Sequence, residues 1–181
     1  IWAYFLYRIQ RLKLKLIPTH SDSAGGLGYL EVVQEYFAPL AIAFAALLAA
    51  SAAEEIITGS LPFESLYYLV PLALVLNLAF FVGPLLLFYS MLRISRQKGL
   101  KDYMIMATHY ATAFDEKWIM NKTATGGSQL GTPDIQSLAD LTNSVKIIQE
   151  MRTVLVSRRL LIAVTACTVL PFLPFVFLKF N

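Results

Sequence analysis

The stretch FAPLAIAFAALLAASAA (residues 37–53) decides the fold of this chain. It contains no Asp, Glu, Lys or Arg, and the same is true of residues 66–92 and 160–178. Uncharged, mostly apolar runs of this length are what a helix needs to cross the hydrocarbon core of a bilayer. Hydrophobic residues make up 57% of the chain and the mean hydropathy is +0.60, above the usual range for soluble domains. We therefore expect an all-α, polytopic membrane protein with three complete spans.

The positive charges predict the orientation of these spans. Of the 15 Lys and Arg residues, all but Lys179 fall in three clusters, at 8–15, 93–146 and 152–159. The connection 54–65 has none and carries three Glu residues. Basic residues are retained on the cytoplasmic side of a membrane. We therefore expect residues 8–36 and 93–159 on the cytoplasmic side of the membrane. The 54–65 connection and the C-terminus are expected on the outer side.

The first residues predict the end of a further span. The segment IWAYFLY (residues 1–7) precedes Arg8 and Arg11, a combination typical of a helix that leaves the membrane through an aromatic interfacial belt. The chain opens at Ile1 without a Met, so we expect an upstream part of this span to be missing. The chain then divides into five parts: the end of a truncated upstream span (1–7), a cytoplasmic interfacial segment with a Gly-rich loop (8–28), a two-span helical hairpin (29–93), a cytoplasmic helical-hairpin insert (94–157) and a last span (158–181).

Three details of these helices are predicted. One continuous helix is expected from Tyr29 to about Ile57, with Pro39 as the site of a bend. The span 66–92 would be about 40 Å long, longer than a bilayer core of about 30 Å, so it must tilt, protrude or kink at Pro71 or Gly83–Pro84. A helix ending at Ser157 could run directly into the last span.

The insert shows two amphipathic patterns. Apolar residues recur at intervals of three and four in each half, which is the period of a helix with one buried face. A Thr-Pro-Asp start at residues 132–134 marks the second helix, and residues 121–131 are expected to form the turn. The two apolar stripes consist of Leu100, Tyr103, Ala107, Tyr110, Phe114 and Trp118, and of Ile135, Leu138, Leu141, Val145, Ile148 and Leu155.

Small residues follow one face of the span that starts near Phe37. Such residues allow helix backbones to approach closely, which favours helix association in lipid. The stripe is therefore predicted to face another helix, within the chain or in an oligomer. It consists of Ala41, Ala45, Ala49 and Ala53.

The segment PTHSDSAGGLG (residues 18–28) is the most site-like part of the chain. Backbone N–H groups before a helix could hold a phosphate or carboxylate. Three interpretations stay open: a structural loop in which Asp22 or Ser23 caps the next helix, an anion or lipid-headgroup site, and a metal site, of which the structural loop is favoured. The candidate ligand-binding residues are His20, Asp22, Ser23, Gly25, Gly26 and Gly28.

Other polar residues carry weaker signals. His109 shares a helix face with Asp102 and Glu116, which favours a solvated stripe over a metal or general-base role. Within the spans, Asn77, Thr165 and Thr168 are candidates for a polar path or for hydrogen bonds between helices, the second being favoured. Ionisable residues, which coupled transporters and proton relays place in their spans, are missing from all three runs.

Known catalytic sequence motifs are missing as well. We expect no catalytic residue, no metal and no cofactor, and nucleic acid is not an expected partner. The single cysteine, Cys167, excludes a disulfide within one chain.

Three segments together carry a family resemblance: LIPTHSDSAGGLGYL (16–30), FDEKW (114–118) and DIQSLADL (134–141). They resemble a family of uncharacterised bacterial integral membrane proteins whose loop usually reads His-Pro-Asp before Ala-Gly-Gly-Leu-Gly; here Ser21 replaces the Pro. The resemblance implies a helical protein of the bacterial inner membrane with four or more spans. It carries no known activity over to this chain.

The leading functional hypothesis is an oligomeric inner-membrane protein with a cytoplasmic helical module, acting as a channel or as a membrane-bound partner module. The alternatives are a membrane-embedded enzyme or lipid- or anion-binding protein that uses residues 20–28, and an accessory subunit of a larger membrane complex. Membrane lipids and further copies or subunits are the expected partners.

Overall fold

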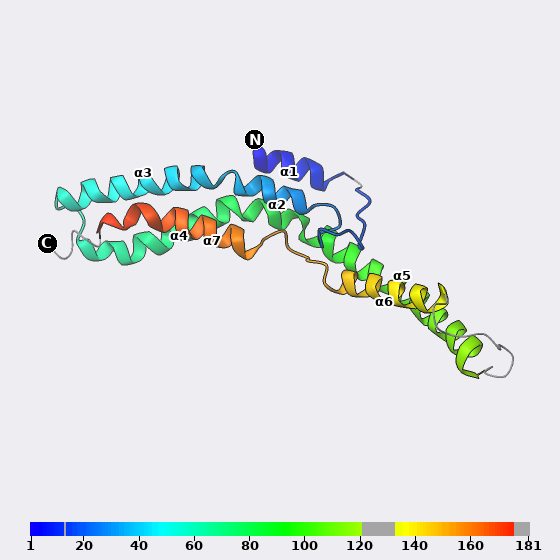
Figure 1. The fold of residues 1–181 in the computed structure, drawn as a ribbon. Coiled ribbons are helices and arrows are strands. Elements are labelled where there is room, and N and C mark those ends of the chain that lie inside the picture. The colour runs from blue at the N-terminus through cyan, green and yellow to red at the C-terminus, as the bar shows by residue number, and fades with distance from the viewer. Residues whose placement is uncertain (13, 121–132, 176–181) are drawn as a thin grey trace. The chain divides into compact units, whose positions relative to one another are not determined.

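The computed structural model describes residues 1–12, 14–120 and 133–175, and every regular element within them is helical (Figure 1). The all-α prediction is therefore confirmed. The α-helices are α1 (Trp2–Gln10), α2 (Gly28–Glu35), α3 (Ala38–Ile57), α4 (Leu66–Phe81), α5 (Tyr89–Asp115), α6 (Pro133–Gln149) and α7 (Arg158–Val169). Shorter turns are the 3-10 helices η1 (Phe63–Ser65), η2 (Gly83–Phe88) and η4 (Leu170–Phe172) and the π-helical turn η3 (Glu116–Met120).

The chain forms two compact units whose segments alternate along the sequence. Unit 1 consists of residues 1–13, 29–88 and 154–181, and unit 2 consists of residues 14–28 and 89–153. The Gly-rich loop therefore belongs with the helical insert, although 60 residues of unit 1 separate them in the sequence.

Unit 1 is built around the small-residue stripe of α3. Ala41 and Ala45 are fully buried and Ala49 nearly so, whereas Ala53 is partly buried and Ala52 takes its place in the core. Helix α3 packs against α7 and α4, and the core cluster continues to Ala73 and Phe172. The stripe thus faces another helix, as predicted, and that helix lies within the chain.

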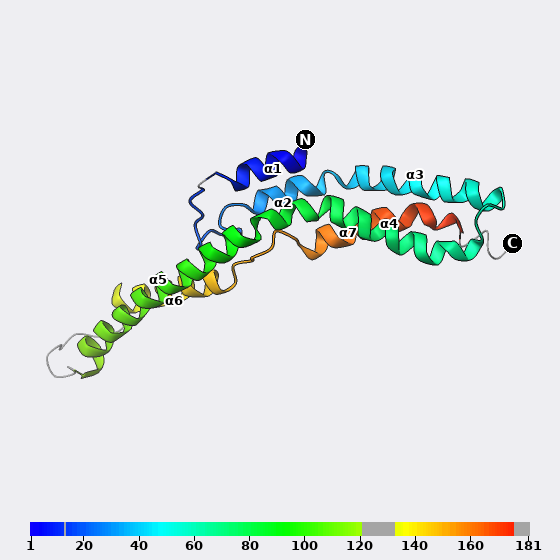
Figure 2. The ribbon, with the colours of Figure 1, turned by 180° about the vertical axis from the view of Figure 1, so that it is seen from behind.

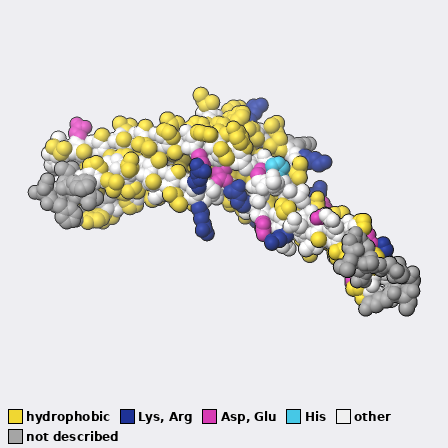
Figure 3. Space-filling model, viewed as in Figure 1, with side chains coloured by type: hydrophobic (Ala, Val, Ile, Leu, Met, Phe, Trp, Pro, Cys, Tyr) yellow, Lys and Arg dark blue, Asp and Glu magenta, His cyan; other side chains and the backbone are white. Residues whose placement is uncertain are grey.

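Two helices of unit 1 are long and apolar enough to cross a membrane, Ala38–Ile57 and Phe63–Phe81. Only 22% and 11% of their most apolar windows are buried, unlike a core helix of a soluble protein. On the face shown in Figure 3, the side chains over α3 are mostly apolar. Leu47 of α3 is 67% exposed, and Phe80 of α4 is 75% exposed.

The last predicted span is not a third such helix within the described residues. Helix α7 has 12 residues, a length of about 18 Å, and η4 follows it at Leu170–Phe172. Pro171 lies in this 3-10 turn, where its missing N–H group does not interrupt an α-helical hydrogen-bond pattern.

The prediction of one continuous helix over 29–57 is wrong. Helix α2 ends at Glu35, the N–H groups of Tyr36 and Phe37 donate to the carbonyls of Val33 and Gln34, and α3 begins at Ala38. The reason is Pro39, which lacks an N–H group and whose ring would clash with the carbonyl of Glu35 in a continuous helix.

The long run 66–92 is interrupted where a kink was predicted. Helix α4 ends at Phe81, and Gly83–Pro84 open the 3-10 segment η2 before α5 begins at Tyr89. Figure 2 shows this path from behind. Pro71, the other candidate, remains inside α4.

Unit 2 contains the predicted pair of helices, since α5 packs along α6. The guanidinium of Arg96 donates to the carbonyl of Gln149 at 2.6 Å. Pro18 of the loop lies against Gly99 of α5, where a Cβ atom would come within 2.6 Å of the Pro18 ring. The turn predicted at residues 121–131 lies outside the described residues.

The prediction that a helix ending at Ser157 runs into the last span is also wrong. Helix α6 ends at Gln149, and the following residues up to Ser157 are not helical. Ser157 is extended, and its side chain accepts a hydrogen bond from the N–H group of Leu160 at 3.1 Å. It therefore caps the start of α7 instead of ending the helix before it.

Candidate functional site

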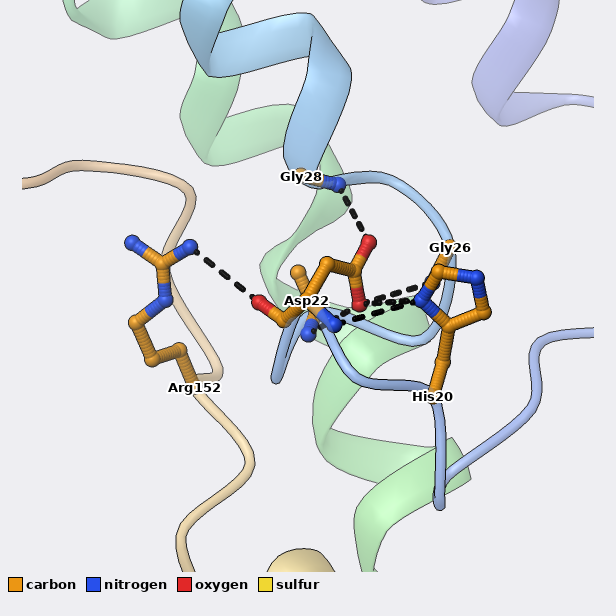
Figure 4. A network of polar contacts seen from close by, with 6 residues as sticks. His20, Asp22, Gly26, Gly28 and Arg152 are labelled. Atoms are coloured by element: carbon orange, nitrogen blue, oxygen red, sulfur yellow. Dashed lines mark hydrogen bonds and ion pairs between the residues drawn. The ribbon is translucent and has the colours of Figure 1, made fainter.

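The carboxylate of Asp22 lies at the centre of the Gly-rich loop (Figure 4). Its Oδ1 accepts hydrogen bonds from the N–H groups of Ala24 at 2.8 Å and Gly26 at 3.1 Å, and its Oδ2 accepts one from Gly28 at 2.9 Å. Gly28 is the first residue of α2. Asp22 therefore caps this helix, as the structural interpretation predicts.

The backbone of the loop bends to bring these N–H groups together. Ser23, Gly25 and Gly26 have positive φ values of 51°, 66° and 96°, which glycine adopts without steric cost. A Cβ atom at Gly25 would also lie 3.1 Å from Met151 and 3.2 Å from Leu16. The glycines are therefore needed for both the turn and its packing.

The surroundings of Asp22 lower its pKa to about 2. Partial burial acts to raise the pKa, but the hydrogen bonds from the N–H groups of Gly28, Ala24 and Gly26 and from His20 outweigh it. Each of these bonds stabilises the charged carboxylate. Asp22 is consequently an anion at neutral pH.

His20 makes the side-chain contact with this carboxylate. Its Nδ1 lies 2.9 Å from Oδ1 of Asp22 and 3.3 Å from the backbone nitrogen of the same residue. One ring nitrogen cannot donate to the first and accept from the second at once. Because the carboxylate contact is shorter and charge-assisted, we assign the Nδ1 proton to the bond with Oδ1.

Arg152 holds the other side of the loop. Its backbone N–H group donates to the carbonyl of Ser23 at 2.7 Å, and its guanidinium lies 3.5 Å from the carbonyl of Asp22 (Figure 4). Sequence reasoning missed this residue. No local pattern links it to the loop, because the two are 130 positions apart.

The predicted ligand-binding residues are thus gathered in one loop, but its donors already bind an anion. The N–H groups of Ala24, Gly26 and Gly28 point at Asp22, so an external phosphate or headgroup would have to displace that carboxylate. This geometry favours the structural interpretation. Among the described residues, no group of three or more His, Cys, Asp or Glu side chains could hold a metal ion.

His109 lies apart from this network. It is exposed on α5, as are Asp102 of the same helix and Glu116 at the start of η3, and in the described part of the chain no hydrogen bond or ion pair joins it to His20 or Asp22. This agrees with the solvated-stripe interpretation.

The acidic–basic segment near the end of α5 fixes the start of α6. Asp134 accepts hydrogen bonds from Lys117 and from the Nε1–H group of Trp118, the second at 3.1 Å. The hydrogen bond from Lys117 and the weaker effect of the bond from Trp118 both lower the pKa of Asp134. These contacts join the two predicted helices of the insert.

The polar residues predicted inside the spans include one buried pair. In unit 1, the Nδ2 group of Asn77 on α4 donates to Oγ1 of Thr168 on α7 at 2.9 Å, and this hydroxyl donates to the carbonyl of Val164 at 2.7 Å. Both side chains are fully buried. Their favoured interpretation, a hydrogen bond between helices, is confirmed, while Thr165 is not part of the pair. Oδ1 of Asn77 has no hydrogen-bond partner among the described residues.

Comparison of the chain with protein-family models, with curated proteins and with solved structures gives no match.

Proposed function

We propose that this chain is a multi-pass protein of the bacterial inner membrane, with unit 1 in the bilayer and unit 2 on the cytoplasmic side. The exposed apolar surfaces of α3 and α4 support this placement. In this proposal α7 and η4 belong to a third span, and α1 is the end of a fourth. The resemblance to bacterial integral membrane proteins belongs to the same proposal.

The contacts of α1 support its place at the membrane surface. Arg8 and Arg11 lie over the rings of Tyr4 and Tyr7, at 6.0 and 4.8 Å from the ring centroids. Aromatic rings and basic side chains of this kind are enriched where a helix leaves the bilayer. The cytoplasmic assignment follows from the basic residues on this side of the spans.

Within this placement we infer that the protein acts as a partner module, and the surface of α5 carries this inference. Met104, Ile105 and Met106 are consecutive on the helix and each about half exposed, so they point in different directions outside the seam with α6. These three side chains leave apolar area exposed on more than one side of α5, and Met adapts readily to a partner's surface. The partner is therefore another protein of a membrane complex.

A channel has less support from the same structure. Asn77 and Thr168, the buried polar pair of unit 1, bond to each other and are fully buried, so within the described residues this pair opens no polar path. The alanine stripe that suggested an oligomer is already buried against helices of the same chain. An oligomeric channel would need a different interface.

Co-purification of the full chain from its native membrane tests the partner module. The variant Ile105→Glu places a charge in the apolar surface of α5, whereas Gln97→Glu adds the same charge at an exposed polar position of the same helix. We expect the partner to be lost from the first variant, at least about tenfold, which corresponds to about 1.4 kcal/mol of binding free energy. It should be retained by the second. Equal recovery with both variants would contradict the proposal, as would a wild-type chain that purifies alone.

A further inference from the structure

An apolar groove runs along unit 1 between α3 and α4. It has a volume of about 500 Å³. One wall is formed by Leu40, Phe44 and Leu47 of α3, and the other by Leu76 and Phe80 of α4. The walls consist of large side chains, and Ala43 leaves a gap between them. Side chains of a helix packed on the groove can fit into such a gap.

The groove continues an interface that is already occupied. Helix α1 packs on η2, the segment that follows α4, and Leu6 is fully buried there. At the N-terminal end of α1, the ring of Trp2 lies 5.3 Å from that of Phe37, and its Nε1–H group donates to Gln34 at 2.7 Å. Phe37 directly precedes α3, so the surface on which α1 packs ends next to the start of the groove.

The N-terminal end of α1 lies on the groove side of unit 1. Figures 1 and 2 both show α1 alongside α2, with its N-terminal end on the side of α3. A helix that continued α1 in this direction would run beside α3, where Leu40 and Phe44 line the groove. The seven-residue interval from Leu40 to Leu47 covers about 10 Å, or two helical turns.

We propose that this groove seats a membrane-spanning helix that continues α1 on the N-terminal side of Ile1. The inference rests on the proposed membrane placement, because the groove is almost wholly apolar and helix packing in lipid depends on close contact of complementary surfaces. The occupant is an apolar helix of the same chain, and its large side chains fill the space beside Ala43. Lipid acyl chains, a second copy and another protein are the competing occupants.

Photo-crosslinking of the full-length protein in its native membrane tests the occupant. Phe80→p-benzoylphenylalanine places the reactive group in the groove, and Val75→p-benzoylphenylalanine places it on another exposed face of α4. We expect an intramolecular product at Phe80 that joins it to a peptide upstream of Ile1, and lipid adducts without that product at Val75. A product with lipid, a second copy or another protein at Phe80, or no product there, would overturn the proposal.

A second pair of variants tests the fit. Ala43→Trp fills the groove, whereas Ala46→Trp adds the same side chain at an exposed position of α3 that does not line it. The upstream crosslink at Phe80 should be lost in the first variant and kept in the second, and its persistence in both would overturn the proposal. Carbonate extraction of the same membranes separates the two levels: a carbonate-resistant protein that lacks the crosslink contradicts the groove assignment alone, and an extractable protein contradicts the membrane placement as well.

Discussion

Asp22 shows how one carboxylate can organise a loop that resembles a ligand site. Three N–H groups that could bind an external anion converge on it, and His20 adds a fourth donor. The loop has the geometry of an anion-binding site, and the anion that it binds is the carboxylate of Asp22. These hydrogen bonds stabilise the start of α2.

We expect Asp22→Asn to lower the stability of the protein at neutral pH by about 1 kcal/mol, because hydrogen bonds to a charged carboxylate are stronger than those to an amide. The amide retains one acceptor oxygen and places an NH₂ group towards a backbone donor. The measurement is the thermal unfolding temperature of the purified protein in mild detergent. Asp102→Asn, at an exposed position of α5, is the control and should leave the unfolding temperature unchanged.

The pH dependence of this difference follows from the lowered pKa. Because the pKa of Asp22 falls from 3.8 in the unfolded chain to about 2 in the fold, its stabilising contribution is complete above about pH 4 and is lost as the pH falls towards 2. The gap between wild type and Asp22→Asn should therefore shrink over this interval. A gap that stays constant between pH 7 and pH 2.5 would contradict the assignment.

The loop residues were predictable from sequence and their partner was not. His, Asp and Gly residues packed into 11 positions indicate a turn and its cap, because those interactions are local. Arg152 bonds to the carbonyls of Ser23 and Asp22 from a place 130 positions after Asp22 in the sequence, and so distant a contact leaves no trace in residue type or spacing. The use of the N–H groups by Asp22 was one of three interpretations that the sequence left open.

Among the helices, the apolar runs predicted where elements lie better than where they break. The Gly83–Pro84 interruption was expected, because a run of 27 residues is too long for the bilayer and contains both residues that disturb a helix. The break before Pro39 was predicted only as a bend. In a continuous helix the Pro39 ring would clash with the carbonyl of Glu35, one turn earlier. Helix α2 therefore ends at Glu35, four residues before the proline that ends it.

The Asn77–Thr168 pair links α4 to α7, and its two partners should respond unequally to substitution. Thr168→Val leaves the Asn77 amide buried without its acceptor, and we expect a loss of about 0.6 to 1.7 kcal/mol, from the average to the maximum found for hydrogen bonds between membrane helices. Asn77→Leu removes the donor together with the unpaired Oδ1 and should cost less. The double variant should match Asn77→Leu.

Thermal unfolding of the four proteins in one detergent measures this cycle. Thr165→Val, on the same helix, is the matched control and should behave like wild type. Equal losses for the two Thr variants would show that the effect is general to α7 and independent of the pair.

At the scale of the whole molecule, the charge pattern makes a prediction about sidedness. In a Cys167→Ala background, Ser60→Cys should react with a membrane-impermeant maleimide on intact spheroplasts, because its loop is acidic and expected outside. Gln136→Cys, on α6, should react only after permeabilisation, because basic segments remain in the cytoplasm. Labelling of both positions from the same side would contradict the proposed topology.

The order of the segments along the chain has a consequence for biosynthesis. Ser23 and Pro18 are synthesised before their partners. The carbonyl of Ser23 later accepts a hydrogen bond from the N–H group of Arg152, and Pro18 later packs against Gly99. At about 5 to 20 residues per second, translation of the 130 positions from Asp22 to Arg152 takes roughly 6 to 26 s. The Gly-rich loop is thus synthesised early and meets its partners late, after the two apolar helices α3 and α4 have been synthesised.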